Sequence, residues 1–353
     1  MDLKELLKLT IDKKASDLHL TEHTSPVIRI DGKLILTQYD PLSKEELKRA
    51  IYGVLNDEQK EKFEKDKELD FSLDLEGLDR FRVNVHIQRG SVEAAFRRIP
   101  IYVPTIDDLG LPTIIPDFAR KSNGLVLITG PTGSGKTTTL AAMINLINTE
   151  RRCMITCIED PIEYVHTNKN SVIKQREVYS DTHTFAEALK RCLRQDPDVI
   201  VVGEMRDLET ISTALTAAET GHLVLATLHT PDAAQTIERI IDVFPSHQQQ
   251  QVRLQISASL EGVVSQTLLP HASGEGRVLA SEVLVATPAV RNLIREKAVE
   301  QIPTAIQTGF QFGMHTMDMS LKNLYQQGLV TYEDAFAQVK NVEEFKRLID
   351  RLD

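Results

Sequence analysis

The sequence lacks several features that define large classes of protein. It has only three cysteines in 353 residues and no C-x-x-C pair, which excludes a disulfide framework and a zinc ribbon. No apolar run approaches the ~18 residues that a membrane-spanning helix requires. The charged opening Met-Asp-Leu-Lys-Glu is unlike a signal peptide. With a net charge of −10, general binding to nucleic acid is not expected. We expect a cytoplasmic globular protein without direct membrane insertion.

The first hundred residues contain short segments in which apolar and polar residues alternate. Between residues 69 and 97 this alternation predicts an antiparallel sheet with one packed face. The same alternation puts Arg82 and Arg97 on the opposite face, where a solvated surface is their ordinary role. The proline-rich stretch 100–116 has little periodicity and is typical of an interdomain linker. We therefore expect an N-terminal α+β domain over residues 1–99.

The strongest signal in the chain lies between an apolar strand, Gly124–Thr129, and a helix expected over residues 138–148. The connecting loop matches G-x-x-x-x-G-K-[ST] and consists of Gly130, Pro131, Thr132, Gly133, Ser134, Gly135, Lys136 and Thr137. Glycines let successive backbone N–H groups point at phosphate oxygens, and the helix N-terminus adds a favourable dipole. Lys136 is expected to contact the β- and γ-phosphates, and Thr137 to ligate Mg²⁺. We therefore predict an ATP site that includes these residues and Thr138.

Strands and helices alternate after this loop. Strands are expected at 154–158, 198–203 and 222–227, and Thr230 and Pro231 are expected to open a further helix. Such alternation predicts a parallel sheet with helices on both faces and with ligands at the carboxyl ends of its strands. We assign residues 117–353 to this second domain, with C-terminal helices from about residue 250.

Polar side chains follow the predicted strands. The carboxylates are Glu159, Asp160 and Glu163 after one strand and Glu204 after the most apolar one. Glu204 stands where a carboxylate that supports Mg²⁺ belongs, and one of the other three could orient the attacking water. His222 and His229 bracket the strand at 222–227, and a histidine beside a phosphate loop can hydrogen-bond a γ-phosphate.

Hydrolysis of a nucleoside triphosphate also needs positive charge beyond Lys136, often an arginine supplied in cis or in trans. Arg82 and Arg97 become candidates for this role. Further candidates near the predicted nucleotide edge are Arg176, Arg194, Arg206 and Arg239. Arg206 and Arg239 could equally be structural ion-pair partners.

Longer motifs resemble those of the secretion and pilus ATPase family over nearly the whole chain. Residues 158–164 resemble its aspartate box, 201–207 its atypical Walker B motif and 220–230 its histidine box. The family's opening motif is similar to residues 15–20. Residues 288–296 resemble a motif of the pilus retraction branch, with Val290 in place of isoleucine, and residues 313–321 are also similar to the family.

This resemblance implies a PAS-like N-terminal domain, a RecA-like ATPase domain and a ring-shaped homo-hexamer. It implies a motor that hydrolyses ATP to power type IV pilus retraction and twitching motility, bound to the cytoplasmic face of an inner-membrane pilus platform. By matching position, Lys136 and Thr137 take the phosphate-loop roles and Glu204 the Walker B role. Glu163 would activate water, His229 would contact the γ-phosphate, and Arg82 and Arg97 would reach the nucleotide.

The resemblance also makes the helix at 288–296 a determinant of retraction, through Arg291, Asn292, Leu293, Ile294, Arg295 and Glu296. From its pattern alone, this helix is an ordinary amphipathic core helix, because Val290, Leu293 and Ile294 cluster on one side.

Alternative functions are an accessory retraction ATPase, a pilus extension or secretion ATPase, a nucleic-acid motor and a nucleotide-gated regulator. Extension and secretion ATPases typically add an N-terminal domain and a tetracysteine zinc site, and we expect neither here, since the sequence has three cysteines.

Overall fold

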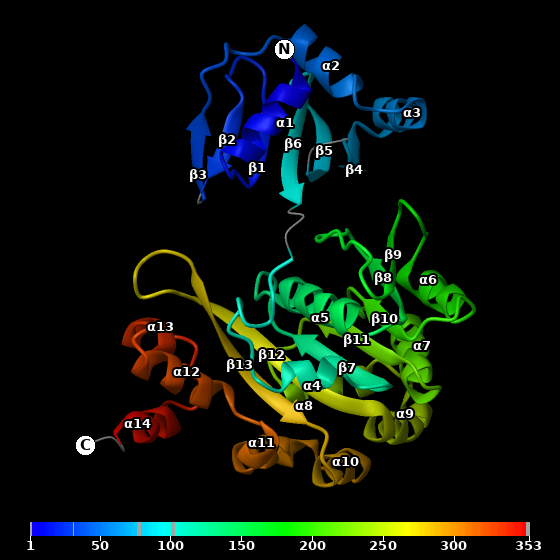
Figure 1. Cartoon of the computed structure of the whole chain (residues 1–353), viewed down its shortest axis with the longest axis vertical. Coiled ribbons are helices and arrows are strands. Elements are labelled where there is room, and N and C mark those ends of the chain that lie inside the picture. The colour runs from blue at the N-terminus through cyan, green and yellow to red at the C-terminus, as the bar shows by residue number, and fades with distance from the viewer. Residues whose placement is uncertain (1, 31, 76–78, 100–102, 351–353) are drawn as a thin grey trace. The chain divides into compact units, whose positions relative to one another are not determined.

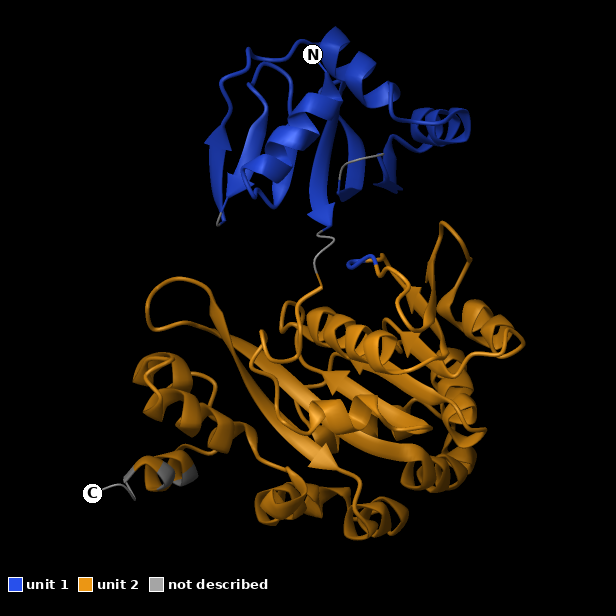
Figure 2. Ribbon diagram, in the orientation of Figure 1, with its two compact units in different colours: residues 1–102, 163–165 blue, residues 103–162, 166–353 orange. Residues whose placement is uncertain are grey.

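Two compact units make up the chain in the computed structural model shown in Figure 1. The structure describes residues 2–30, 32–75, 79–99 and 103–350. The first unit consists of residues 1–102 with 163–165, and the second of residues 103–162 with 166–353 (Figure 2). Within the described residues, no helix is long and apolar enough to cross a membrane.

The first unit is a six-stranded sheet in the order β3-β2-β1-β6-β5-β4, and every neighbouring pair is antiparallel. Its strands are β1 (Asp17–Leu20), β2 (Val27–Ile30), β3 (Lys33–Leu36), β4 (Glu68–Leu73), β5 (Arg80–Gln88) and β6 (Ser91–Ile99). Three helices pack their apolar side chains into the same core: α1 (Leu3–Asp12), α2 (Lys44–Tyr52) and α3 (Asp57–Asp66). The alternation seen in the sequence sets the faces, since Phe81 and Val83 are buried while Arg82 between them is exposed.

The second unit is a seven-stranded sheet in the order β13-β12-β7-β11-β10-β8-β9, parallel except for β13 at one edge. The strands are β7 (Gly124–Thr129), β8 (Met154–Glu159), β9 (Val172–Glu177), β10 (Val199–Val202), β11 (Leu223–Leu228), β12 (Leu260–Pro270) and β13 (Arg277–Val285). Alternate residues of β7 enter two different cores, Leu125 on one face and Val126 on the other. Both faces are therefore covered, as a parallel sheet requires.

Helices cover the sheet on both sides and continue beyond it. Those next to the sheet are α4 (Ile115–Ala119), α5 (Lys136–Glu150), α6 (Phe185–Cys192), α7 (Leu208–Glu219), α8 (Ala233–Asp242) and α9 (Ser246–Ser259). The C-terminal helices are α10 (Pro288–Arg295), α11 (Ile302–Thr308), α12 (Met317–Gln326), α13 (Tyr332–Phe336) and α14 (Val342–Asp350), with 3₁₀ turns at Val299–Gln301 and Phe310–Phe312. Helix α4 lies close against the sheet, because a Cβ on Gly262 of β12 would come within 2.2 Å of the Phe118 ring.

Several sequence expectations differ from the structure. The region predicted to be helical from about residue 250 also contains two strands, β12 and β13, at residues 260–270 and 277–285. The prediction failed because a short apolar run cannot be assigned to helix or strand from its pattern alone. The N-cap of α8 is Asp232, whose side chain accepts from the Gln235 N–H, and not Thr230. β9 was not expected.

The predicted linker, residues 100–116, also differs from the structure. Its first three residues lie outside the described residues. From residue 103 onward the segment belongs to the second unit, because Ile106, Leu111 and Ile115 are buried in that unit's core.

Candidate active site

The glycine-rich loop leaves the carboxyl end of β7 and enters α5. Gly130, Gly133 and Gly135 have φ values of 138°, 80° and 89°, a region that glycine adopts without strain. A Cβ on Gly130 would lie 2.2 Å from the carbonyl oxygen of Gln266, so the loop folds tightly against β12. No side chain caps α5, and the buried Ser134 Oγ has no hydrogen-bond partner among the described residues. Open N–H groups and this hydroxyl suit a phosphate ligand.

Lys136 extends back into this loop from the first turn of α5. Its Nζ donates to the carbonyl oxygens of Gly130 at 2.8 Å and Pro131 at 2.9 Å. The same Nζ lies 3.4 Å from Nδ1 of His229, which follows β11. Lys136 is only 8% exposed, so its charge lies inside the loop.

A row of charged groups continues from Lys136 along the carboxyl edge of the sheet. His229 Nε2 is 3.1 Å from Glu204 Oε1, and an Arg206 guanidinium nitrogen is 2.6 Å from Glu204 Oε2. The contacts arise because β10 and β11 are parallel neighbours in register, so their ends meet. Burial would raise the pKa of the Glu204 carboxyl, but the hydrogen bond from Arg206 and the charges of His229 and Arg206 outweigh it and lower that pKa. Glu204 therefore stays ionised.

The other candidate carboxylates follow β8, which ends at the same edge. Glu159 accepts a hydrogen bond from the Gln175 amide at 2.9 Å, so it is held by β9. The pKa of Arg206 is raised, first by its hydrogen bond to Glu204 and to a smaller extent by the charge of Asp160. Glu163 is exposed and has no hydrogen bond or ion pair among the described residues. Its carboxylate is therefore open to solvent.

Magnesium was expected at Thr137 and Glu204. Thr137 is half-buried in the first turn of α5, and its hydroxyl has no hydrogen bond among the described residues. Among those residues, no group of three or more His, Cys, Asp or Glu side chains could hold a metal ion. The side chains fit a metal held mainly by phosphate oxygens and water, with one hydroxyl ligand, which is the usual arrangement for Mg²⁺.

Four candidate residues are not brought to this edge within the second unit. One is Glu163, which groups with the first unit although it follows β8 in the chain. The others are His222, Arg82 and Arg97. His222 precedes β11, and its Nδ1 lies 2.9 Å from the Ala217 carbonyl oxygen, at the amino edge of the sheet. The six residues of β11 separate it from His229 by about 20 Å. Arg82 and Arg97 belong to the first unit, where they face each other across β5 and β6. Arg97 donates to Asp17 at 2.9 Å, so it is already ion-paired.

The retraction-type motif also lies at the amino edge, in α10. Val290 and Ile294 are buried and Leu293 is partly buried, whereas Asn292, Arg295 and Glu296 are exposed. This helix therefore has both a core face and a free polar face.

Arg291 is held between these two faces of α10. One of its nitrogens donates to the carbonyl oxygens of Ser257 at 2.9 Å and Ala258 at 2.7 Å, at the end of α9. The other is 2.8 Å from Glu261, which Lys121 also contacts at 2.7 Å. No sequence motif marks Glu261 or Lys121, so sequence patterns alone do not predict this network.

The chain is similar to known proteins over nearly its whole length. A family model described as type II/IV secretion system protein matches residues 2–337. The type IV pilus retraction ATPase PilT of Pseudomonas aeruginosa is 50% identical over 345 residues, which cover 98% of this chain and 100% of that protein. The type IV pilus ATPase PilU of the same species is 41% identical over 349 residues, with coverage of 99% and 91%.

A solved structure, described as the pilus retraction motor PilT with bound ADP, matches with a TM-score of 0.93. The two are 47% identical, and the match covers 98% of this chain and 99% of that one. This match confirms the predicted fold class, an N-terminal α+β domain followed by a RecA-like domain with a parallel sheet. The resemblance seen in the motifs is confirmed as well: the chain belongs to the type II/IV secretion system protein family.

Proposed function

We propose that this protein is a motor ATPase that powers the retraction of type IV pili. The observation that carries the proposal is the continuous row from Lys136 through His229 and Glu204 to Arg206, beside an uncapped glycine loop. The similarity to PilT over nearly its whole length supports retraction as the purpose of the hydrolysis.

The phosphate loop binds the triphosphate of ATP. The Lys136 ammonium exchanges its contacts with the Gly130 and Pro131 carbonyl oxygens for the β- and γ-phosphates. The binding residues are the loop itself with Thr137 and Thr138 at the start of α5. Thr137 and Glu204 would hold the Mg²⁺ that accompanies ATP, together with phosphate oxygens and water, and the metal would supply positive charge beside the phosphates.

His229 and Glu163 serve the hydrolysis step. His229 already lies between Lys136 and Glu204, so a hydrogen bond from its ring to the γ-phosphate would link that phosphate to both. Glu163 has an exposed carboxylate that orients the attacking water. Glu159 and Asp160 support this edge of the sheet.

Arg82 and Arg97 supply further positive charge to the nucleotide, in cis or in trans, within a homo-hexameric ring. In this proposal a PAS-like domain of residues 1–99 moves against the ATPase domain of residues 117–353. The ring docks on a platform protein of the pilus machinery, at the cytoplasmic face of the inner membrane. Nucleic acid is not a partner, in keeping with the net charge of −10.

An accessory retraction ATPase is the second candidate. The identity of 41% to PilU, over 99% of this chain, favours it enough to require a test. Deletion separates the two: loss of a main retraction ATPase leaves cells hyperpiliated and without twitching. Normal retraction in the deletion strain would exclude the main role.

Hydrolysis is tested first with the purified protein. Phosphate release from Mg²⁺·ATP is expected, and Glu204→Ala should lose it because the metal site and the anchor of His229 disappear together. Equal phosphate release by wild type and Glu204→Ala would contradict the proposed site. Stimulation by single-stranded DNA that weakens with salt would point instead to a nucleic-acid motor.

A further inference from the structure

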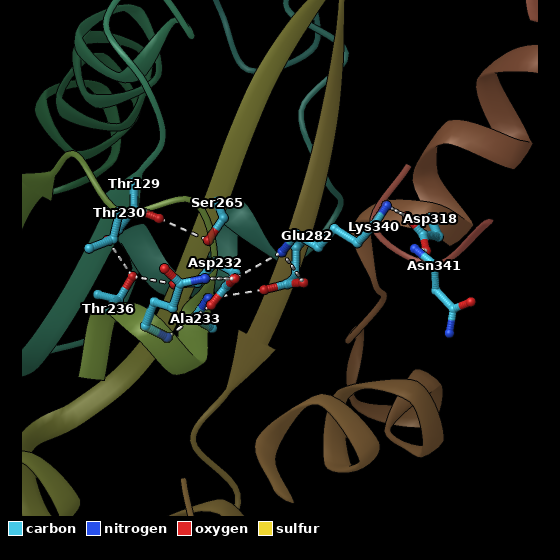
Figure 3. A network of polar contacts seen from close by, with 11 residues as sticks. Thr129, Thr230, Asp232, Ala233, Thr236, Ser265, Glu282, Asp318, Lys340 and Asn341 are labelled. Carbon is cyan, nitrogen blue, oxygen red and sulfur yellow. Dashed lines mark hydrogen bonds and ion pairs between the residues drawn. The ribbon is translucent and has the colours of Figure 1, made fainter. Parts of the chain in front are cut away.

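One lysine connects the C-terminal helices to the nucleotide half of the second unit. Lys340 lies in the turn between α13 and α14. The backbone N–H groups of Lys340 and Asn341 both donate to the buried carboxylate of Asp318 on α12, each at 3.1 Å. Asp318 therefore fixes this turn, and the Lys340 side chain extends from it toward Glu282 and Asp232 (Figure 3).

Lys340 contacts both carboxylates that hold the first turn of α8. Its Nζ is 3.2 Å from Asp232 and 3.5 Å from Glu282. Asp232 caps α8, and the buried Glu282 of β13 accepts from the Ala233 N–H at 3.0 Å. Two neighbouring carboxylates repel each other, and burial makes the charge of Glu282 costly. Lys340 offsets both effects.

The first turn of α8 in turn holds the segment that carries His229. Thr236 of α8 donates to the Asp232 carbonyl oxygen at 2.6 Å, and Thr230 donates to the Thr236 hydroxyl at 2.6 Å. Because Thr236 is fully buried, it anchors residues 230–232 to α8. His229 directly precedes this anchored segment, and its ring contacts Lys136 and Glu204.

We propose that Lys340 is a positioning residue of the nucleotide site, which fixes His229 by neutralising Asp232 and Glu282 at the start of α8. Through this lysine, the docking of the C-terminal helices determines how well the site engages a γ-phosphate. The role rests on the proposed function, because it takes His229 to be the γ-phosphate contact.

The test compares the affinity of the whole chain for Mg²⁺·ATP with its affinity for ADP, in wild type and in a variant of Lys340. In Lys340→Met the two carboxylates lose their counter-ion, and the start of α8 shifts. We expect kcat and affinity for Mg²⁺·ATP to fall about tenfold, because small misplacements of a phosphate contact are costly. Affinity for ADP should stay unchanged, since ADP has no γ-phosphate for His229 to contact.

Three further variants separate positioning from folding. Lys340→Arg should restore ATP affinity, because it keeps the positive charge. Lys340→Met with Glu282→Gln should restore it in part, because the amide oxygen still accepts from Ala233 while the repulsion is gone. Lys346→Met changes an exposed lysine of α14 and should behave as wild type.

Two results would overturn the positioning role. One is wild-type ATP kinetics in Lys340→Met. The other is a parallel loss of ATP and ADP affinity that follows the loss of thermal stability, because a folding defect affects both nucleotides. If the wild-type protein itself neither binds nor hydrolyses ATP, the proposed function is refuted first, and the two failures are thereby distinguished.

Discussion

The two edges of the second unit's sheet carry networks of similar composition and different purpose. At the carboxyl edge, Lys136 and Arg206 flank His229 and Glu204, and Lys136 is the buried member. At the amino edge, Lys121 and Arg291 share Glu261, and Arg291 also holds two carbonyl oxygens at the end of α9. Each edge pairs cations with one carboxylate.

The difference lies in what surrounds the charges. The carboxyl edge adds a loop of positive-φ glycines and an uncapped helix N-terminus, both of which favour an anion. At the amino edge, Lys121 and Arg291 are already paired with Glu261, and Arg291 also donates to two carbonyl oxygens. Among these contacts, no group is free to bind an anion. Charge alone therefore does not make a nucleotide site, and the backbone geometry decides which edge binds phosphate.

The largest expected effect is that of Lys136→Ala. Removing the phosphate-contacting cation should lower turnover at least about 10²–10³-fold, because charge that develops on the phosphates loses its stabilisation. Steady-state phosphate release measures it. Lys121→Ala is the matched control at the amino edge, and the comparison between the edges fails if both variants lose turnover to the same degree.

Glu163→Gln should separate binding from hydrolysis. The amide cannot act as a base, so turnover is expected to fall about 10²–10⁴-fold. ATP affinity should remain close to wild type, since Glu163 is exposed and its substitution leaves the residues of the phosphate loop unchanged. Fluorescent-nucleotide titration beside phosphate release checks this, and a loss of ATP binding would contradict its role with water.

Arg291→Ala should spare hydrolysis by the purified protein and impair retraction. The variant loses a cap on α9 and a partner of Glu261, so the free energy of unfolding should fall by about 1–3 kcal/mol. Chemical denaturation and twitching assays measure the two effects. A large drop in the ATPase rate would mean that the amino edge is part of the catalytic machinery.

The smallest effect is expected from Arg206→Ala, because its side chain is 70% exposed. The folded pKa of Glu204 lies below its ordinary value of 4.5, so its ionisation stabilises the fold above that pH and ceases to do so as pH falls through the folded pKa. The variant should bring the pKa up toward 4.5 and cost about 0.2–1 kcal/mol near neutral pH. Denaturation at pH 7 and at pH 3 should therefore differ less in the variant than in wild type.

Much of the second unit could be predicted from local signals. The loop 130–137 can be recognised from its glycines, Lys136 and the apolar strand before it. The apolar runs at 199–202 and 223–228 directly predict buried strands. The strands 260–270 and 277–285 were not predicted, because an apolar run alone does not show which strand it pairs with. Gln266, Glu261 and Lys340 could not be predicted either, since their importance comes from tertiary contacts with distant residues.

Gly262 is a position at which the fold leaves no room for a larger side chain. Because Gly262 has no side chain, the Phe118 ring can lie directly on β12. Even alanine there would force the ring aside, together with the short stretch by which residues 103–119 are seated on the sheet. Even the smallest enlargement at this position would therefore disturb the packing of the segment that leads into β7.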